Sequence, residues 1–343
     1  MGVIDTLTAG FQVVVRKPWL LLIPLLLDLV LLASPKVSVE PLFEDMAAIA
    51  EETLGLAGEV QPGGAEAAAA PSAGDANVLA AMEQMDLLRA AMADFNLLSL
   101  LALNRLLLPS IAGIRAIDPA ADSVIQVGSM GQAAMIALVL VGLGLFLACA
   151  FWTLLAQQVR RDRNSLTDLG RQVPVFWLRM IAVGVIVLGF MLVLGVVGVL
   201  ISLAAQVFAL LGVAAVAQVV TGLLMYAMWL VVLWLMFYLV FVPQAVTLAE
   251  ASPMGALRQS FIIVRATFWR TLILFVLVNI ISTGLGYLWV LLMTSLAGTL
   301  AAIVANAFVG TGLVAAMFIF FRDRIIALHH AQLHLQATRS GSA

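Results

Sequence analysis

Charged residues are scarce in this chain. Only 10% of its 343 residues are Asp, Glu, Lys or Arg, while 64% are hydrophobic. Soluble globular proteins have about a quarter charged and about half apolar residues. The shortage of charge therefore excludes an ordinary soluble domain and indicates an integral membrane protein.

Cysteine and histidine are almost absent too. Cys149 is the only cysteine, so an intramolecular disulfide is excluded. His330 and His334 stand four residues apart, a spacing that can hold a metal, but no cysteine lies nearby and no acidic residue follows them. The chain also lacks a phosphate-binding loop, a nucleophile beside a base and an orienting acid, and paired carboxylates within a span. We therefore expect a non-enzymatic protein with no catalytic residue, no cofactor and no metal.

Long apolar runs are what the sequence has in abundance. A helix of about 20 residues crosses the ~30 Å hydrocarbon layer of a bilayer. Divided at that length, the runs predict an all-α integral membrane protein with about six spans, near residues 19–33, 131–157, 179–203, 218–242, 268–292 and 298–321. We interpret the first run as a short, retained span rather than a signal peptide, because Asp28 interrupts it and Ser34-Pro35 is a poor cleavage site.

The basic residues fix the orientation of these spans. Thirteen of the seventeen Lys and Arg residues fall on one side of a six-span arrangement. The positive-inside rule assigns that side to the cytoplasm. The sequence thus predicts a multi-pass protein of the cell membrane, one polytopic domain over residues 1–343, with both termini in the cytoplasm.

An acidic insert separates the first two predicted spans. Residues 35–130 contain thirteen acidic and four basic side chains, which suits an extracytoplasmic segment. We expect helices at about 41–56 and 78–108 and a flexible loop at about 61–77. The apolar run 97–114 has the length of a span, but a crossing there would send the cluster at Arg160 outside. We therefore interpret it as an interfacial or helix-packing segment.

A short cytoplasmic amphipathic helix is predicted before each of three hairpins of spans. Ser252 and Pro253 are typical of a helix start. Apolar residues then follow at steps of three, four and three, and the same steps occur at two other places: Met254, Leu257, Phe261 and Val264; Ile4, Leu7, Phe11 and Val14; Leu166, Leu169, Val173 and Phe176. Two readings stay open, namely three parallel repeats and the spacing of any amphipathic helix.

One of these segments resembles a known family. The stretch GALRQSFIIVRATFWRTLILF, Gly255 to Phe275, follows the capping residues Ala251 to Pro253. It is similar to the arginine, serine and large-aromatic signature of a bacterial multi-span membrane domain. That domain is attached to some glycerophosphoryl diester phosphodiesterases and occurs in related uncharacterised membrane proteins. In the fused proteins the chemistry belongs to a separate soluble barrel, which this chain has no room for, so the resemblance does not imply phosphodiesterase activity.

Polar side chains inside predicted spans are the candidate site residues. Asp28 lies near mid-membrane in the first span, Asn279 lies at similar depth in the fifth, and Asn306 lies in the sixth. An acid in a membrane is costly and is a functional candidate by default. Asp28 either binds a cation or proton or forms structural hydrogen bonds, and the second is favoured because no other acid in a span could serve as a relay partner. The two asparagines are more typical of hydrogen bonding between helices.

Five basic residues flank the predicted amphipathic helices and spans: Arg16, Lys17, Arg258, Arg265 and Arg270. At the cytoplasmic surface such residues meet anionic lipid headgroups rather than nucleic acid. Two function classes follow. The first is a scaffold or accessory subunit that binds lipid and a membrane-protein partner. The alternative is a transporter or lipid-handling protein with a path near Asp28 and Asn279.

Overall fold

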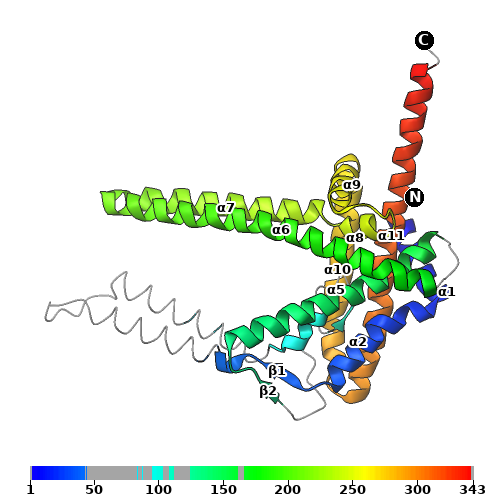
Figure 1. Ribbon diagram of the computed structural model, residues 1–343, viewed down its shortest axis with the longest axis horizontal. Helices are drawn as coiled ribbons and strands as arrows, with labels where there is room; N and C mark the ends of the chain where they lie inside the picture. The colour runs from blue at the N-terminus through cyan, green and yellow to red at the C-terminus, as the bar shows by residue number, and fades with distance from the viewer. Residues whose placement is uncertain are drawn as a thin grey trace. The chain divides into compact units, whose positions relative to one another are not determined.

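The computed structural model describes residues 2–42, 44, 83, 87, 95–102, 108–111, 124–160 and 166–340, and about 88% of it is helical. The elements run as follows: α1 Val3–Arg16, η1 Pro18–Leu21, α2 Leu22–Ala33, β1 Lys36–Ser38, η2 Leu97–Ala102, β2 Val124–Gln126, α5 Met130–Arg160, α6 Leu166–Phe208, η4 Ala209–Val213, α7 Ala214–Tyr238, α8 Val242–Thr247, α9 Pro253–Ala266, α10 Phe268–Leu292 and α11 Leu296–Ser340 (Figure 1). The predicted all-α class is confirmed.

Among the residues that the structure describes, five helices are long and apolar enough to cross a membrane: α5, α6, α7 with the adjoining α8, α10 and α11. They contain the second to sixth predicted spans, and α10 has the predicted bounds. The segment of the first predicted span is shorter than these five helices. It consists of the four-residue 3-10 turn η1 followed by the twelve residues of α2. The apolar character of the long helices makes this a membrane protein.

Two of the predicted boundaries were wrong. The amphipathic helix expected before the third span is continuous with that span, because α6 runs through Pro174 without a break. Conversely, the fourth span was expected to reach Val242, yet α7 ends at Tyr238. Pro243 occupies the first turn of α8, and a proline has no N–H to donate to the carbonyl group four residues earlier, here that of Leu239. A short turn therefore separates α7 from α8.

The chain forms two compact units, and their boundaries fall within α5, α10 and α11. Unit 1 comprises residues 1–21, 145–285 and 308–343, and unit 2 comprises residues 22–144 and 286–307. At the centre of unit 1, every residue of α8 is buried. Phe241 stacks on Phe320 of α11 with ring centroids 5.6 Å apart, and it also contacts Phe321. Aromatic stacking of this kind holds the α7–α8 turn against α11.

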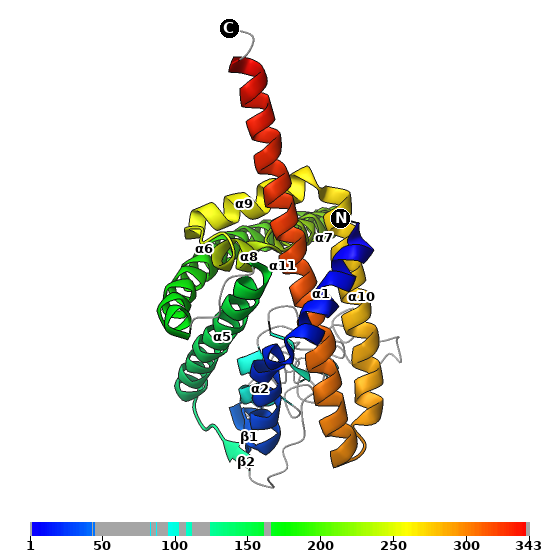
Figure 2. The ribbon, with the colours of Figure 1, turned by 90° about the vertical axis from the view of Figure 1, so that its right-hand side faces the viewer.

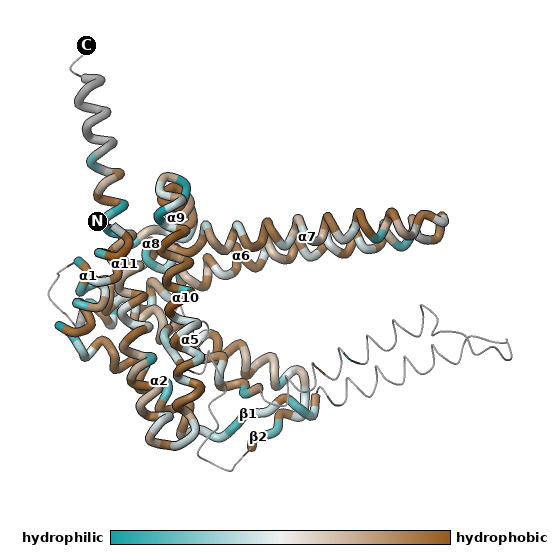
Figure 3. Tube along the Cα trace, turned by 180° about the vertical axis from the view of Figure 1, so that it is seen from behind, coloured by the Kyte–Doolittle hydropathy of each residue, from teal (hydrophilic) through white to brown (hydrophobic). Residues whose placement is uncertain are grey.

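Within unit 1, α6 and α7 form a long hairpin (Figure 1). Its tip is the turn η4, where Gly212 has φ of 82°, a conformation that glycine adopts without a steric penalty. Apolar residues follow one another along both helices (Figure 3). In each long helix we consider the most apolar stretch of 18 residues. Only 6% of that stretch is buried in α6 and none in α7, whereas 72% is buried in α11. The protein's own core thus covers very little of the hairpin.

Unit 2 contains the one feature that the sequence did not indicate, a pair of short strands. β1 and β2 are parallel, with Lys36 opposite Val124. The Asn96 side chain accepts a hydrogen bond from the Val37 amide at 3.1 Å and so ties η2 to β1. A small core lies beside the strands: Val37, Val39, Leu42, Leu97, Val127 and Leu140. The acidic insert therefore begins and ends on paired strands.

Most of the insert lies outside the described residues, including the predicted loop 61–77 and most of the predicted helices 41–56 and 78–108. Within the run 97–114, the structure describes η2 and residues 108–111. Leu97, Ala102, Leu108 and Ile111 are buried there. This agrees with a packing segment at these positions.

The apolar stripes of α1 and α9 are buried to different extents, since Leu7 and Val14 of the α1 stripe are buried but only Val264 of the α9 stripe is. In α9, Val264 is buried, but Met254 and Phe261 are exposed. The buried face instead consists mainly of small residues, Ala256 and Ser260 together with Ile263 and Val264. In α1 the buried residues are Thr6, Leu7, Gly10 and Val14. Close packing requires small side chains, which is why the largest apolar residues do not define the buried face.

Candidate functional site

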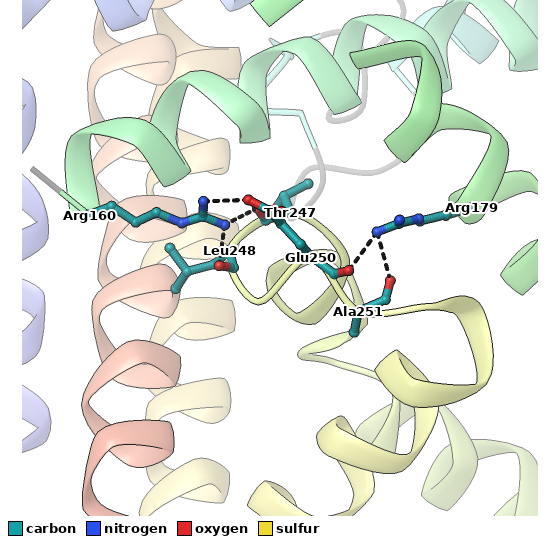
Figure 4. Close-up of polar contacts among 6 residues, drawn as sticks. All are labelled: Arg160, Arg179, Thr247, Leu248, Glu250 and Ala251. Atoms are coloured by element: carbon teal, nitrogen blue, oxygen red, sulfur yellow. Dashed lines mark hydrogen bonds and ion pairs between the residues drawn. The ribbon is translucent and has the colours of Figure 1, made fainter. Parts of the chain in front are cut away.

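The densest set of polar contacts in unit 1 surrounds the loop between α8 and α9 (Figure 4). Arg160, the last residue of α5, reaches this loop. Its guanidinium forms an ion pair with Glu250 at 2.7 Å and donates hydrogen bonds to the carbonyl oxygens of Thr247, at 2.9 Å, and Leu248. The end of a helix leaves carbonyl groups without partners. Arg160 therefore caps α8 and fixes the loop that follows.

A second arginine holds the other side of the same loop. Arg179 of α6 donates to the carbonyl oxygens of Glu250, at 2.6 Å, and Ala251, at 3.3 Å (Figure 4). Glu250 has φ of 53°, the only positive φ of a non-glycine residue in the part of the chain that the structure describes. That conformation costs about 1–3 kcal/mol. The two arginines offset this strain and orient the start of α9.

A third arginine makes a similar contact between α11 and α5. Arg322 donates to the carbonyl oxygen of Val159 at 2.9 Å and pairs with Asp323 at 2.9 Å. Charged groups bonded to main-chain oxygens position helices but supply no reactive centre. Within the described residues, no group of three or more His, Cys, Asp and Glu could hold a metal. The arginine-held loop thus connects α5, α6 and α8 through hydrogen bonds to main-chain oxygens.

Asp28 forms its own polar cluster in unit 2. Its side chain has no exposed surface. The Ser110 hydroxyl donates to one carboxyl oxygen, and the Ile111 amide lies 3.2 and 3.1 Å from the two oxygens. The partners come from the segment that follows η2, part of the run predicted to be interfacial or helix-packing. Asp28 therefore joins α2 to that segment.

The two candidate asparagines differ from Asp28 and from each other. The Asn279 side chain donates to the carbonyl oxygen of Phe275, one turn earlier in α10, at 2.8 Å. It thus bonds to its own helix. The side-chain nitrogen of Asn306 is buried without a hydrogen-bond partner among the described residues. Asp28 and Asn306 belong to unit 2, and Asn279 belongs to unit 1.

The five predicted headgroup-facing residues are all exposed: Arg16, Lys17, Arg258, Arg265 and Arg270. Arg16 and Lys17 lie at the end of α1. Arg258 and Arg265 lie on α9, and Arg270 lies in the first turn of α10. None of their side chains forms a hydrogen bond or ion pair with another residue that the structure describes.

The chain was compared with protein-family models, curated proteins and solved structures. None of them matches it. The site must therefore be interpreted from its own geometry.

Several residues of these clusters were not selected from the sequence. Arg160 and Arg179 were counted only as cytoplasmic charges, and Glu250 was not considered. One signal was available: Glu250 is the only acid between Asp168 and Asp323, which marks it as a partner for nearby arginines. No local sequence pattern indicated Ser110 as a partner of Asp28, because the two residues lie 82 positions apart.

Proposed function

We propose that this protein is a non-enzymatic scaffold or accessory subunit of the cell membrane, with six spans and cytoplasmic termini. The α6–α7 hairpin binds a second membrane protein. The observation that carries this proposal is the contrast in burial between α11, at 72%, and the two hairpin helices, at 6% and 0%. A spanning helix with so little cover from its own chain offers its whole side surface to lipid or to another helix.

The surface of α6 has a shape that suits another helix. Gly184, Gly189 and Gly195 have open space where a Cβ would lie. Gly195 lies in a shallow apolar depression beside Leu192 and Val196. Helices in membranes associate closely where small residues allow the backbones to approach. We therefore place the partner's helix on α6, on the face of Gly195.

The hairpin is also longer than one crossing. With a rise of 1.5 Å per residue, the 43 residues of α6 extend about 65 Å, roughly twice the hydrocarbon thickness. Arg179 divides α6 into a cytoplasmic part and an uncharged part that enters the membrane. The cytoplasmic part then lies outside the lipid and adds to the docking surface.

The alternative, transport along a path near Asp28 and Asn279, has less support. Asp28 is bonded to Ser110 and Ile111, and Asn279 is bonded to its own helix. Tight packing at glycines also suits a fixed bundle. A Cβ on Gly10 would lie 2.5 Å from the Gly312 carbonyl oxygen. The resemblance to the membrane domain that accompanies some phosphodiesterases is part of the same proposal, in which the chain supports a partner and catalyses nothing.

The test is site-specific photo-crosslinking followed by purification in mild detergent. A photoreactive residue at Leu192, which is 63% exposed, should capture a discrete protein, while one at the fully buried Ala316 should not. Gly195→Leu should reduce the captured protein several-fold, and Gly131→Leu, which also has open space at its Cβ, should leave it unchanged. Capture of lipid alone at Leu192 would contradict the proposal.

A further inference from the structure

The helix α9 has two faces of different character. Ala256, Ser260 and Ile263 are buried against the rest of unit 1. The Ser260 hydroxyl donates to the Tyr238 carbonyl oxygen at 2.6 Å and accepts from the Phe241 amide at 3.2 Å, which fastens α9 to the end of α7. Because helical residues three, four and seven apart share a face, Met254, Arg258, Phe261, Ile262 and Arg265 form the opposite face, and all five are exposed.

That exposed face is unusually apolar for one in contact with water. The exposed fractions are 65% for Met254, 48% for Phe261 and 43% for Ile262, and Trp269 just beyond α9 is 72% exposed. Two arginines alternate with the apolar side chains along it. An in-plane helix at a membrane surface has this combination, with apolar groups in the acyl boundary and arginines at the headgroups.

A series of stacked aromatic rings connects this face of α9 to the sides of α7 and α10. Phe261 stacks on Tyr238 at 4.6 Å, Tyr238 on Trp234 at 5.9 Å, and Trp234 on Phe268 at 5.8 Å. Tyr and Trp concentrate where a membrane meets water. Figure 2 shows α9 running across the direction of α10, and Phe268 is the first residue of α10. The exposed face of α9 therefore lies at the depth of the headgroups and not out in the cytoplasm.

The charged residues of α9 and α10 are all basic, while Asp323 of α11 lies near Arg324. From Ala251 to Arg322 the sequence contains no acidic residue, but it contains Arg258, Arg265 and Arg270. Arg270 lies close enough to Arg324 of α11 for the two guanidinium groups to repel each other. A phosphate group near them would relieve this repulsion. Positive charge held at the edge of the hydrocarbon layer attracts anionic lipid.

We infer that the exposed face of α9 and the first turn of α10 form a docking surface for anionic phospholipids, with Arg258, Arg265 and Arg270 contacting the headgroup phosphates and Met254, Phe261 and Ile262 contacting the acyl boundary. This inference rests on the proposed function only in that the protein spans a membrane. It adds a defined lipid class and a defined surface, and it does not depend on a protein partner at the hairpin.

The full-length protein should be reconstituted in bilayer discs of phosphatidylglycerol and phosphatidylcholine in equal amounts, and the lipids that remain bound on release should be counted by native mass spectrometry. Each arginine at an anionic surface gives about a five-fold preference. The wild type should therefore retain phosphatidylglycerol at least about ten-fold over phosphatidylcholine. The triple variant Arg258→Gln, Arg265→Gln and Arg270→Gln should lose most of that preference.

A charge-conserving control separates this effect from misfolding. The triple variant Arg258→Lys, Arg265→Lys and Arg270→Lys should keep most of the preference, and the wild-type preference should fall as salt is raised. Equal preference in the wild type and the glutamine variant would overturn the inference. So would equal thermal stabilisation by glycerol phosphate and by phosphatidylglycerol, because the site would then recognise a free phosphate. Crosslinking at Leu192 is a separate readout, so failure here leaves the hairpin proposal standing.

Discussion

At the scale of single residues, the hydrogen-bond donors around Asp28 determine its structural role. Both oxygens of its carboxyl group face donors, the Ser110 hydroxyl and the Ile111 amide. A buried acceptor that is hydrogen-bonded to its donors stabilises a fold. Removal of either the acceptor or the donor leaves the other buried without a partner. Asp28 therefore contributes to the packing of α2 on the segment after η2.

Asp28→Asn should lower the thermal stability of the purified protein. The amide nitrogen of asparagine would face a donor in place of one carboxyl oxygen. The free energy of unfolding should therefore fall by about 1–3 kcal/mol. Thermal unfolding in detergent measures it. Asn279→Ala is the matched control, because Asn279 bonds only to the Phe275 carbonyl oxygen of its own helix in the described residues, and its effect should be much smaller. Equal unfolding temperatures for Asp28→Asn and the wild type would contradict this role.

At the scale of elements, short connections are held by long arginine side chains. The loop after α8 carries its strained residue, Glu250, between Arg160 and Arg179 (Figure 4). Most of these contacts go to main-chain oxygens rather than to the Glu250 side chain. The loop should therefore depend more on the arginines than on the acid.

Arg160→Ala should release this loop. Its loss removes two bonds to carbonyl oxygens and one ion pair, so amide hydrogen exchange over residues 248–252 should become at least about ten-fold faster, as loss of about 1.4 kcal/mol of local stability requires. Hydrogen exchange with mass spectrometry measures the change. Glu250→Gln should have a smaller effect, and Arg171→Ala, at an exposed position of α6, should have none. Equally fast exchange in Glu250→Gln and in Arg160→Ala would show that the ion pair, which both variants lose, dominates.

The elements differ in how well the sequence predicts them. The bounds of α10 follow directly from its apolar run, and Ser252 and Pro253 start α9 as predicted, since both signals are local. The end of α7 was not predicted, because a proline lies inside an apolar run and hydropathy alone does not register it. The contacts of Arg160 and Asp28 join positions more than 80 residues apart, and no local pattern contains such information.

At the scale of the whole molecule, two of the amphipathic helices match each other in detail. α1 and α9 each have 14 residues, Val3–Arg16 and Pro253–Ala266, and both bounds differ by 250 positions. Their buried faces use corresponding positions as well: Thr6 and Ala256, Gly10 and Ser260, Val14 and Val264. This correspondence favours internal repetition over chance spacing for these two helices. α6 departs from it, because its amphipathic part and its span form one helix.

The proposed six-span topology predicts which side of the membrane each turn occupies. Cys149 is fully buried and is the only cysteine, so a Cys149→Ala background is free of thiols. Leu210→Cys at the hairpin tip, where Leu210 is 88% exposed, should then react with an impermeant maleimide in intact cells. Arg171→Cys should react only after the cells are opened. Labelling of Arg171→Cys in intact cells, without labelling of Leu210→Cys, would reverse the orientation.

The uncharged hairpin has a consequence for how the protein is made. From Met180 to Ala249 the chain contains no charged residue, and the turn at Gly212 is itself apolar. Moving a charged group through hydrocarbon is the costly step of insertion, and this segment contains none to move. The two helices can therefore enter the bilayer together as a preformed pair. In the proposed topology, the thirteen acidic residues of the insert have to be carried across the membrane by the translocation machinery. The first hairpin should therefore insert more slowly than the α6–α7 hairpin and depend more on that machinery.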